Sequence, residues 1–194
     1  MTIKADVRLD AKGLACPMPI VKTKKAIKEL SGGQVLEVAA TDKGSKADLS
    51  AWAQSTGHEY LGTTEEGDVL FHYIRKSGGD AGADKPFEHT IENGELLTRN
   101  GLILDVRQEA EYIFGHVPKA KSVPLEELDE RMDELDPNEE VYVICRTGRR
   151  SELAAHKLAA NGFSKVYNVL PGMKDWTGEL IKGPEKNEKG GSGI

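Results

Sequence analysis

Two cysteines, Cys16 and Cys145, are the side chains in this 194-residue sequence best suited to covalent chemistry. A cysteine thiolate can accept and pass on a sulfur atom, attack a phosphoryl group or form a disulfide. Two cysteines are too few for a disulfide framework or a four-ligand metal site, so we expect no metal and no cofactor. What each thiol can do depends on the residues around it.

Cys145 stands between an apolar run at 141–144 and a predicted helix at 151–161. The residues that would form the loop and open the helix are Arg146, Thr147, Gly148, Arg149, Arg150 and Ser151. A helix N-terminus and three arginines favour a thiolate, and Gly148 allows the loop to curl with its amides inward. We predict a cradle for a sulfur anion, a sulfur oxyanion or a phosphate. The alternative is a buried, inert cysteine beside surface arginines.

Cys16 precedes Pro17 and Pro19, at the start of a helix that apolar spacing predicts over 20–30. Proline is tolerated in the first turn of a helix, where backbone N–H groups have no intrahelical partner. The prolines hold Cys16 near the helix N-terminus, where the dipole favours a thiolate. The alternative is a small residue buried at a helix cap.

Composition divides the chain into two parts. Residues 1–77 contain 11 basic and 10 acidic side chains, whereas the remainder contains 15 and 22. Small residues and turn formers at 77–86 predict a flexible linker. We therefore expect a first domain at 1–77, a linker at 78–87, a second domain at 88–181 and a disordered tail at 182–194.

The first part has the order βαβαββ. Its predicted strands lie at 7–9, 35–40, 58–61 and 69–74, and its helices at 20–30 and 46–56. Ser45 is a candidate cap for the second helix. Two helices on one face of a four-stranded sheet would form a two-layer α+β sandwich.

The second part alternates strands and helices. The strands are predicted at 102–104, 141–144 and 165–168 and around Val123, and the helices at 110–114, 125–135, 151–161 and 174–178. This order predicts an α/β domain with a parallel central sheet, in which sites lie beyond the carboxyl ends of the strands. Cys145 falls at such an end.

The overall charge and hydropathy exclude other classes of protein. A net charge of −6 argues against a general nucleic-acid binder. No apolar run approaches the roughly 18 residues that a membrane span needs, and the first ten residues lack the apolar segment of a signal peptide. We therefore expect a cytoplasmic protein that binds neither nucleic acid nor membranes.

Residues 88–180 resemble a single-domain rhodanese. The matching motifs are ILDVR at 103–107, EY at 111–112, GHVP at 115–118, CRTGRRS at 145–151 and LPGM at 170–173, with Trp176. The resemblance implies a sulfurtransferase in which Cys145 carries sulfane sulfur as a persulfide. It also implies that residues 146–151 hold the persulfide and an anionic substrate, and that Asp105 and Arg107 support the site. A structural ion pair is an equal alternative for those two residues.

Two departures matter for this resemblance. The family pattern Leu-x-Gly-Gly reads Leu170-Pro171-Gly172-Met173 here, so the second glycine is absent. Cysteine phosphatases and arsenate reductases use a similar loop, but the phosphatases place an arginine six positions after the cysteine. Here Arg150 is the fifth residue after Cys145, and the smaller cradle suits sulfur better. Turnover of an aryl phosphate, lost in Cys145→Ala, would support phosphatase chemistry.

Residues 6–76 resemble the TusA family, also called SirA-like. The resemblance rests on LDAKGLACPMP at 9–19, KK at 24–25 and TD at 41–42. It implies a small sulfur carrier whose cysteine, here Cys16, holds a persulfide for handover to a partner. Asp42 matches a family feature, and a turn or capping role is its alternative.

The pair of resemblances suggests a sulfur relay. We expect Cys145 to take sulfane sulfur from thiosulfate, or from a small persulfide such as that of glutathione or coenzyme A. Cys145 would pass the sulfur to Cys16, which would deliver it to an acceptor protein. A short flexible linker would hold the thiols at a millimolar effective concentration. The alternatives are reverse transfer, a first domain that only docks partners, and a redox-sensing disulfide between the cysteines.

Overall fold

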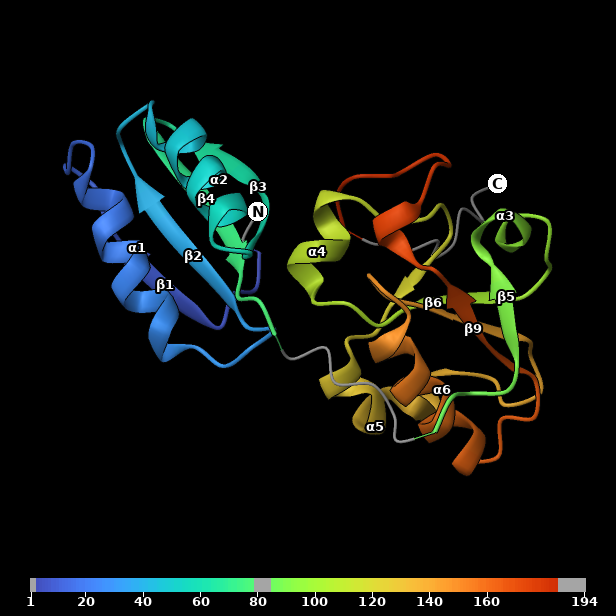
Figure 1. The fold of residues 1–194 in the computed structure, drawn as a ribbon. Coiled ribbons are helices and arrows are strands. Elements are labelled where there is room, and N and C mark those ends of the chain that lie inside the picture. Colours follow the sequence, from blue (N-terminus) through green and yellow to red (C-terminus); the bar gives the residue numbers. More distant parts are fainter. Residues whose placement is uncertain (1–2, 79–84, 185–194) are drawn as a thin grey trace, which may run out of the picture. The chain divides into compact units, whose positions relative to one another are not determined.

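The computed structural model describes residues 3–78 and 85–184, in two compact units, Met1–Ala81 and Gly82–Ile194 (Figure 1). Most of the predicted linker and tail lies outside the described residues. Residues 85–87 of the predicted linker pack on the second unit. The Phe87 N–H donates to Glu152 Oε1 at 3.2 Å, and the Lys85 carbonyl lies 2.8 Å from His156 Nε2. Phe87 packs against the hydrophobic core of the second unit, because this contact removes its apolar ring from water.

The first unit has the predicted βαβαββ order. Its elements are β1 (Val7–Asp10), α1 (Met18–Glu29), β2 (Val35–Ala40), α2 (Ser45–Ser55), β3 (Glu59–Glu66) and β4 (Val69–Arg75). The sheet order is β1-β2-β4-β3, with β1 parallel to β2 and β4 antiparallel to both its neighbours. Ile27 of α1 and Leu49 of α2 share one core with Leu36 of β2, so both helices cover the same face of the sheet.

Both helices of the first unit begin earlier than predicted. Helix α1 begins at Met18, because Pro19 is compatible with its first turn. Helix α2 begins at Ser45 itself, with Gly44 at the N-cap position, so the prediction that Ser45 caps this helix is wrong. The Ser45 hydroxyl instead donates to the Asp42 carbonyl at 2.5 Å and lies 2.9 Å from His72 Nε2. These bonds tie the start of α2 to the sheet.

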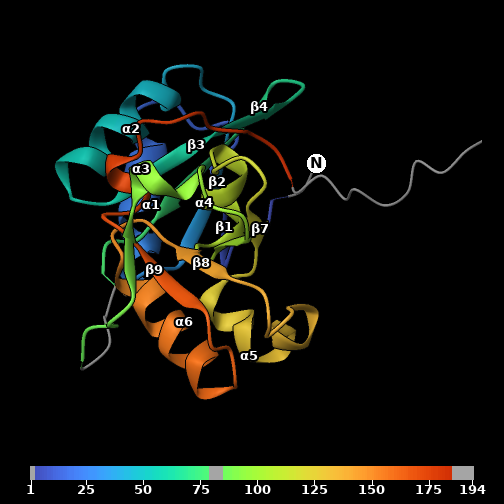
Figure 2. The same cartoon turned by 90° about the vertical axis from the view of Figure 1, so that its right-hand side faces the viewer.

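The second unit contains the predicted parallel sheet, in the order β5-β9-β8-β6-β7. The strands are β5 (Thr90–Glu92), β6 (Leu102–Asp105), β7 (Lys121–Ser122), β8 (Val141–Ile144) and β9 (Val166–Leu170). The helices are α3 (Asn93–Leu96), α4 (Glu109–Phe114), α5 (Leu128–Arg131) and α6 (Arg149–Ala160). Figure 2 shows α6 running alongside β9, and Ala154, Ala155 and Leu158 of α6 are buried in a core that includes Val166 of β9. The pattern did not predict β5, in which only Ile91 is buried, or the one-turn helix α3.

Two predicted helices of the second unit are wrong in form. The segment predicted as a helix at 125–135 consists of a 3₁₀ helix (Leu125–Glu127), α5 and a second 3₁₀ helix (Met132–Glu134). Its apolar residues recur every three or four positions, which a 3₁₀ helix satisfies as well as an α-helix. The helix predicted at 174–178 is only the 3₁₀ turn Met173–Asp175.

The strand register positions the candidate site. Asp105, the last residue of β6, pairs with Ile144, the last residue of β8. Cys145 therefore emerges at the carboxyl edge of the sheet, next to the residues that follow β6. Within residues 3–78 and 85–184, the helices are all too short or too polar to cross a membrane.

Candidate functional site

The thiol of Cys145 lies at the end of β8, and the residue is 1% exposed. Its Sγ accepts a hydrogen bond from the Gly148 N–H at 3.2 Å, and Ser151 Oγ lies 3.3 Å away. Helix α6 begins at Arg149, so the sulfur stands at a helix N-terminus, where N–H groups stabilise negative charge. The structure thus brings Gly148 and Ser151, two of the predicted site residues, to the thiol.

The loop requires glycine at position 148. Gly148 has a φ of +87°, and a Cβ at this position would lie 2.2 Å from Leu170 Cδ2. Any other residue would be strained at this φ, and its Cβ would have to displace the Leu170 side chain. Because the Gly148 N–H is the amide that contacts Sγ, a backbone shift that relieves the strain would disturb this donor.

A second backbone segment holds the loop from the other side. The N–H groups of Met173 and Lys174 donate to the carbonyls of Cys145 and Arg146, both at 2.9 Å. Gly172 approaches so closely that a Cβ would lie 2.6 Å from the Cys145 carbonyl oxygen. Met173 contributes only its N–H here. The absence of a second glycine therefore leaves the contact intact.

Asn93 fixes Gly172 in turn. Its Nδ2 donates to the Gly172 carbonyl at 2.8 Å, and its Oδ1 accepts from the Gly172 N–H at 3.1 Å. Asn93 begins α3, immediately after β5. The unpredicted elements β5 and α3 therefore support the backbone around Cys145.

The three arginines of the loop have different surroundings. Arg150 is buried and donates from both terminal nitrogens to Glu111 of α4, at 2.7 and 2.9 Å. Arg149 is exposed, and Arg146 and Thr147 are half-buried. Arg146 and Arg149 are therefore the loop arginines that reach the surface, whereas Arg150 joins the loop to α4.

Asp105 and Arg107 form a second buried ion pair. Arg107 donates to the Asp105 carboxylate from Nε and from a terminal nitrogen, the latter at 2.6 Å, and also through its backbone N–H. The same guanidinium donates to the Gly115 carbonyl at 2.8 Å. These contacts favour the structural alternative for the pair, which ties the end of β6 to the end of α4.

Sequence reasoning missed three residues of this site: Glu111, Asn93 and Asn168. Asn168 lies within β9, where its Nδ2 donates to the Gly148 carbonyl at 3.1 Å. A polar residue in a strand with buried apolar neighbours was the signal that could have identified it. Asn93 had no comparable signal, because its partner Gly172 lies 79 positions away.

Cys16 is exposed and stands two residues before α1. The hydrogen-bonded carboxylate of Asp48 raises the pKa of its thiol, with smaller contributions from burial and from the charges of Asp48 and Asp42. This reverses the expectation that the helix start favours a thiolate here. The carboxylates come from α2 and from the loop before it. The prediction for Cys16 rested only on residues 16–30 and therefore could not include them.

A buried polar network holds the loop that carries Asp42. His72, which is 0% exposed, meets Ser45 Oγ through Nε2 and the Tyr60 hydroxyl through Nδ1, at 2.9 and 2.8 Å. Burial is the main reason that the pKa of His72 is lowered to about 4, and the charge of Lys46 contributes. Asp42 Oδ1 accepts a hydrogen bond from the Gly44 N–H at 3.2 Å, which agrees with the alternative that Asp42 stabilises a turn. Its charge also contributes to the raised pKa of Cys16.

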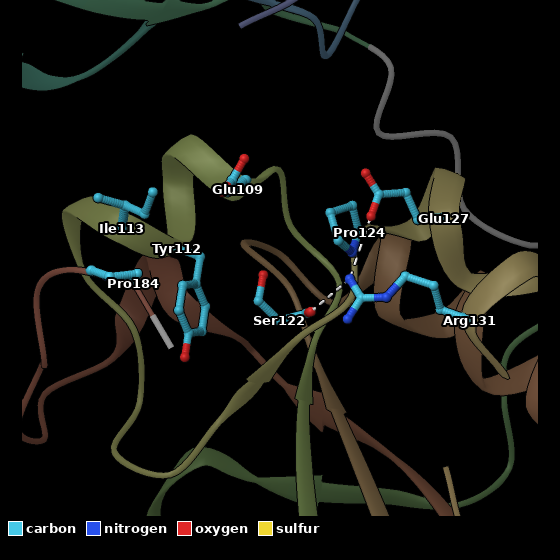
Figure 3. A pocket seen from close by; sticks show the side chains of 8 residues that line it. All are labelled: Glu109, Tyr112, Ile113, Ser122, Pro124, Glu127, Arg131 and Pro184. Atoms are coloured by element: carbon cyan, nitrogen blue, oxygen red, sulfur yellow. Dashed lines mark hydrogen bonds and ion pairs between the residues drawn. The ribbon is translucent and has the colours of Figure 1, made fainter. Parts of the chain in front are cut away.

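A pocket of about 300 Å³ opens elsewhere in the second unit (Figure 3). It is lined by Glu109, Tyr112, Ile113, Ser122, Pro124, Glu127, Arg131 and Pro184. Arg131 donates to the Ser122 carbonyl at 3.2 Å and pairs with Glu127 and Glu134. The predicted site residues are not among those that line the pocket, so it is separate from the predicted chemistry.

Comparison with known proteins agrees with this two-part organisation. A family model described as Sulfurtransferase TusA matches residues 7–76, and one described as Rhodanese-like domain matches residues 87–179. The "Putative sulfur carrier protein YrkF" of Bacillus subtilis is 52% identical over 186 residues, which cover 91% of this chain and 98% of that protein.

Shorter matches cover one unit each. The "Sulfur carrier protein TusA" of Allochromatium vinosum is 49% identical over 72 residues, which cover 37% of this chain and 95% of that protein. A crystal structure of a rhodanese-like domain protein from Staphylococcus aureus is 31% identical and covers 48% of this chain and 97% of that one, with a TM-score of 0.46. The chain thus belongs to the family in which a TusA sulfur carrier domain is followed by a rhodanese-like domain.

Proposed function

We propose that this protein is a sulfurtransferase that relays sulfane sulfur from a small donor, through Cys145, to Cys16. The observation that carries the proposal is the contrast between the two thiols. Cys145 is enclosed at a helix N-terminus with an amide donor on its sulfur, whereas Cys16 is exposed at the surface of the other unit. An enclosed thiol suits uptake from a small molecule, and an exposed thiol suits delivery to a protein.

The first step is uptake of sulfur. With thiosulfate as donor, the Cys145 thiolate attacks the outer sulfur, the bond between the two thiosulfate sulfurs breaks, and sulfite leaves with its electron pair. With a glutathione or coenzyme A persulfide, the thiolate of the small molecule leaves instead. Arg146 and Arg149 supply positive charge for these anionic donors, and the loop amides stabilise the persulfide anion.

The second step is transfer between the two cysteines. The Cys16 thiolate attacks the terminal sulfur of the Cys145 persulfide, a new S–S bond forms on Cys16, and the Cys145 thiolate leaves. A downstream acceptor protein then takes the sulfur from Cys16. Because Asp48 raises the pKa of Cys16, this step accelerates as the pH rises through the pKa of the thiol.

Sulfite release from thiosulfate, with a small thiol as final acceptor, tests the first step. Cys145→Ser should abolish release, whereas Cys16→Ser should retain a first burst of one sulfite per chain. If Cys16→Ser also leaves sulfuration of an acceptor protein unchanged, the first unit is a docking module. Phosphatase chemistry is disfavoured because Arg150 would have to leave Glu111 to hold a phosphate.

A further inference from the structure

Two buried side chains behind the Cys145 thiol form a chain of contacts that the relay does not use. Ser151 Oγ lies 3.3 Å from Sγ and 2.6 Å from Asn168 Oδ1. Asn168 Nδ2 in turn donates to the Gly148 carbonyl at 3.1 Å. Ser151 is 0% exposed and Asn168 is 2% exposed, so bulk water cannot replace a lost partner.

The single hydroxyl proton of Ser151 can serve only one of two acceptors, Cys145 Sγ at 3.3 Å or Asn168 Oδ1 at 2.6 Å. Turning the Asn168 amide over would set its oxygen against the Gly148 carbonyl, two acceptors without a proton between them, so Oδ1 faces Ser151. Oδ1 only accepts, and the Ser151 hydroxyl has one proton, which therefore goes to Asn168. Ser151 then presents a lone pair to Sγ. A protonated thiol satisfies this lone pair by donating its S–H.

Loss of the thiol proton breaks this arrangement. A thiolate and the Ser151 lone pair are two acceptors in contact, unless the hydroxyl turns and donates to Sγ. Turning leaves Asn168 Oδ1 buried without a donor, which is unfavourable. We infer that Asn168, acting through the Ser151 hydroxyl, is a positioning residue that favours the protonated thiol of Cys145. Its effect is opposite to that of the Gly148 N–H, which donates to Sγ and favours the thiolate.

This inference rests on the proposed role of Cys145 as the nucleophile, because it describes what controls that nucleophile. The elements packed around Cys145 carry the charged groups Asp105, Arg107, Glu109, Glu111, Arg146, Arg149, Arg150, Glu152, Lys157, Lys174 and Asp175. Variants of Ser151 and Asn168 leave all of them in place. A difference between these variants therefore reports on the hydroxyl and the amide.

The test is the pH profile of iodoacetamide alkylation in full-length Cys16→Ser protein, where Cys145 is the remaining thiol. Asn168→Ala frees the Ser151 hydroxyl to donate to Sγ. We expect the midpoint of the profile to move to lower pH, and alkylation below that midpoint to be about 3- to 10-fold faster, the equivalent of one net hydrogen bond. Asn161→Ala, on the exposed end of α6, is the matched control and should leave the profile unchanged.

The decisive comparison repeats Asn168→Ala in a Ser151→Ala background. If Asn168 acts through the hydroxyl, the substitution no longer moves the midpoint there. A shift of equal size in both backgrounds, no shift, or a shift to higher pH overturns the inference. Asn168→Val fills more of the space without offering an acceptor to Ser151, and it replaces Asn168→Ala if the latter loses cooperative unfolding. Alkylation needs no sulfur donor, so its outcome is independent of whether the proposed relay operates.

Discussion

His72 should make the stability of the first unit depend on pH. Ser45 donates its own proton to the Asp42 carbonyl, so His72 Nε2 must donate to Ser45, and Nδ1 accepts from Tyr60. The network is therefore complete with a neutral ring. Burial, assisted by the charge of Lys46, lowers the pKa of His72 from its ordinary value of 6.5 to about 4.

The sign and size of the effect follow from these two values. Between pH 6.5 and about 4 the unfolded chain binds a proton at His72 that the folded chain does not. The stabilisation is thus present at pH 7 and is lost as the pH falls through this window. From pH 7 to pH 5, His72 alone should remove about 2 kcal/mol from the free energy of unfolding of the first unit.

The two tryptophans allow each unit to be followed separately, because Trp52 lies in the first core and Trp176 in the second unit. Urea denaturation is measured by Trp52 fluorescence in a Trp176→Phe background, at pH 7 and pH 5, with His72 and with His72→Gln. The loss of stability on acidification should be about 2 kcal/mol smaller in the His72→Gln protein. An equal loss in both proteins would refute the role assigned to His72.

Three further changes test the two thiol sites. Glu111→Gln removes the carboxylate that pairs with the buried Arg150 guanidinium, so the free energy of unfolding of the second unit should fall by about 3–5 kcal/mol. The measurement is urea denaturation followed by Trp176 fluorescence in Trp52→Phe protein. A loss below about 1 kcal/mol would contradict this role. Gly148→Ala should slow alkylation of Cys145 at least about tenfold, because alanine is strained at this positive φ, its Cβ meets Leu170 Cδ2, and the backbone shift weakens the amide donor to Sγ. Gly162→Ala has a similar positive φ but open space around Cβ, and an equal effect there would assign the loss to strain alone. Asp48→Asn should lower the pKa of Cys16 and speed its alkylation at neutral pH, measured in Cys145→Ser protein. The control Asp68→Asn, in the β3–β4 turn, should leave the rate unchanged. A rate that Asp48→Asn does not change would exclude control by this carboxylate.

Local sequence patterns predicted the elements that carry the thiols. The apolar run at 141–144 and the glycine and arginines after Cys145 specify a strand, a curled loop and a helix within about a dozen residues. The prolines beside Cys16 likewise mark a helix start. These are short-range properties of the chain, and α1, α2, β2, β8 and α6 all lie within a few residues of their predicted positions.

Long-range contacts were beyond such patterns. Asn93 reaches Gly172, Glu111 pairs with Arg150, and Asp48 acts on Cys16, in each case across more than 30 positions of sequence. The tertiary fold alone decides these pairings. They also changed the chemical interpretation most, since Arg150 is paired with Glu111 and the thiolate of Cys16 is disfavoured by the carboxylates of Asp48 on α2 and Asp42 before it.

The central claim is the order of transfer from Cys145 to Cys16. Its most direct test is a time course of intact and peptide mass after loading with thiosulfate or a small persulfide, for the wild type, Cys145→Ser and Cys16→Ser. The relay predicts a gain of about 32 Da, one sulfur atom, first on Cys145 and then on Cys16 in the wild type, and on Cys145 alone in Cys16→Ser. If Cys16 in Cys145→Ser protein loads from the small donor at the wild-type rate, the relay is contradicted.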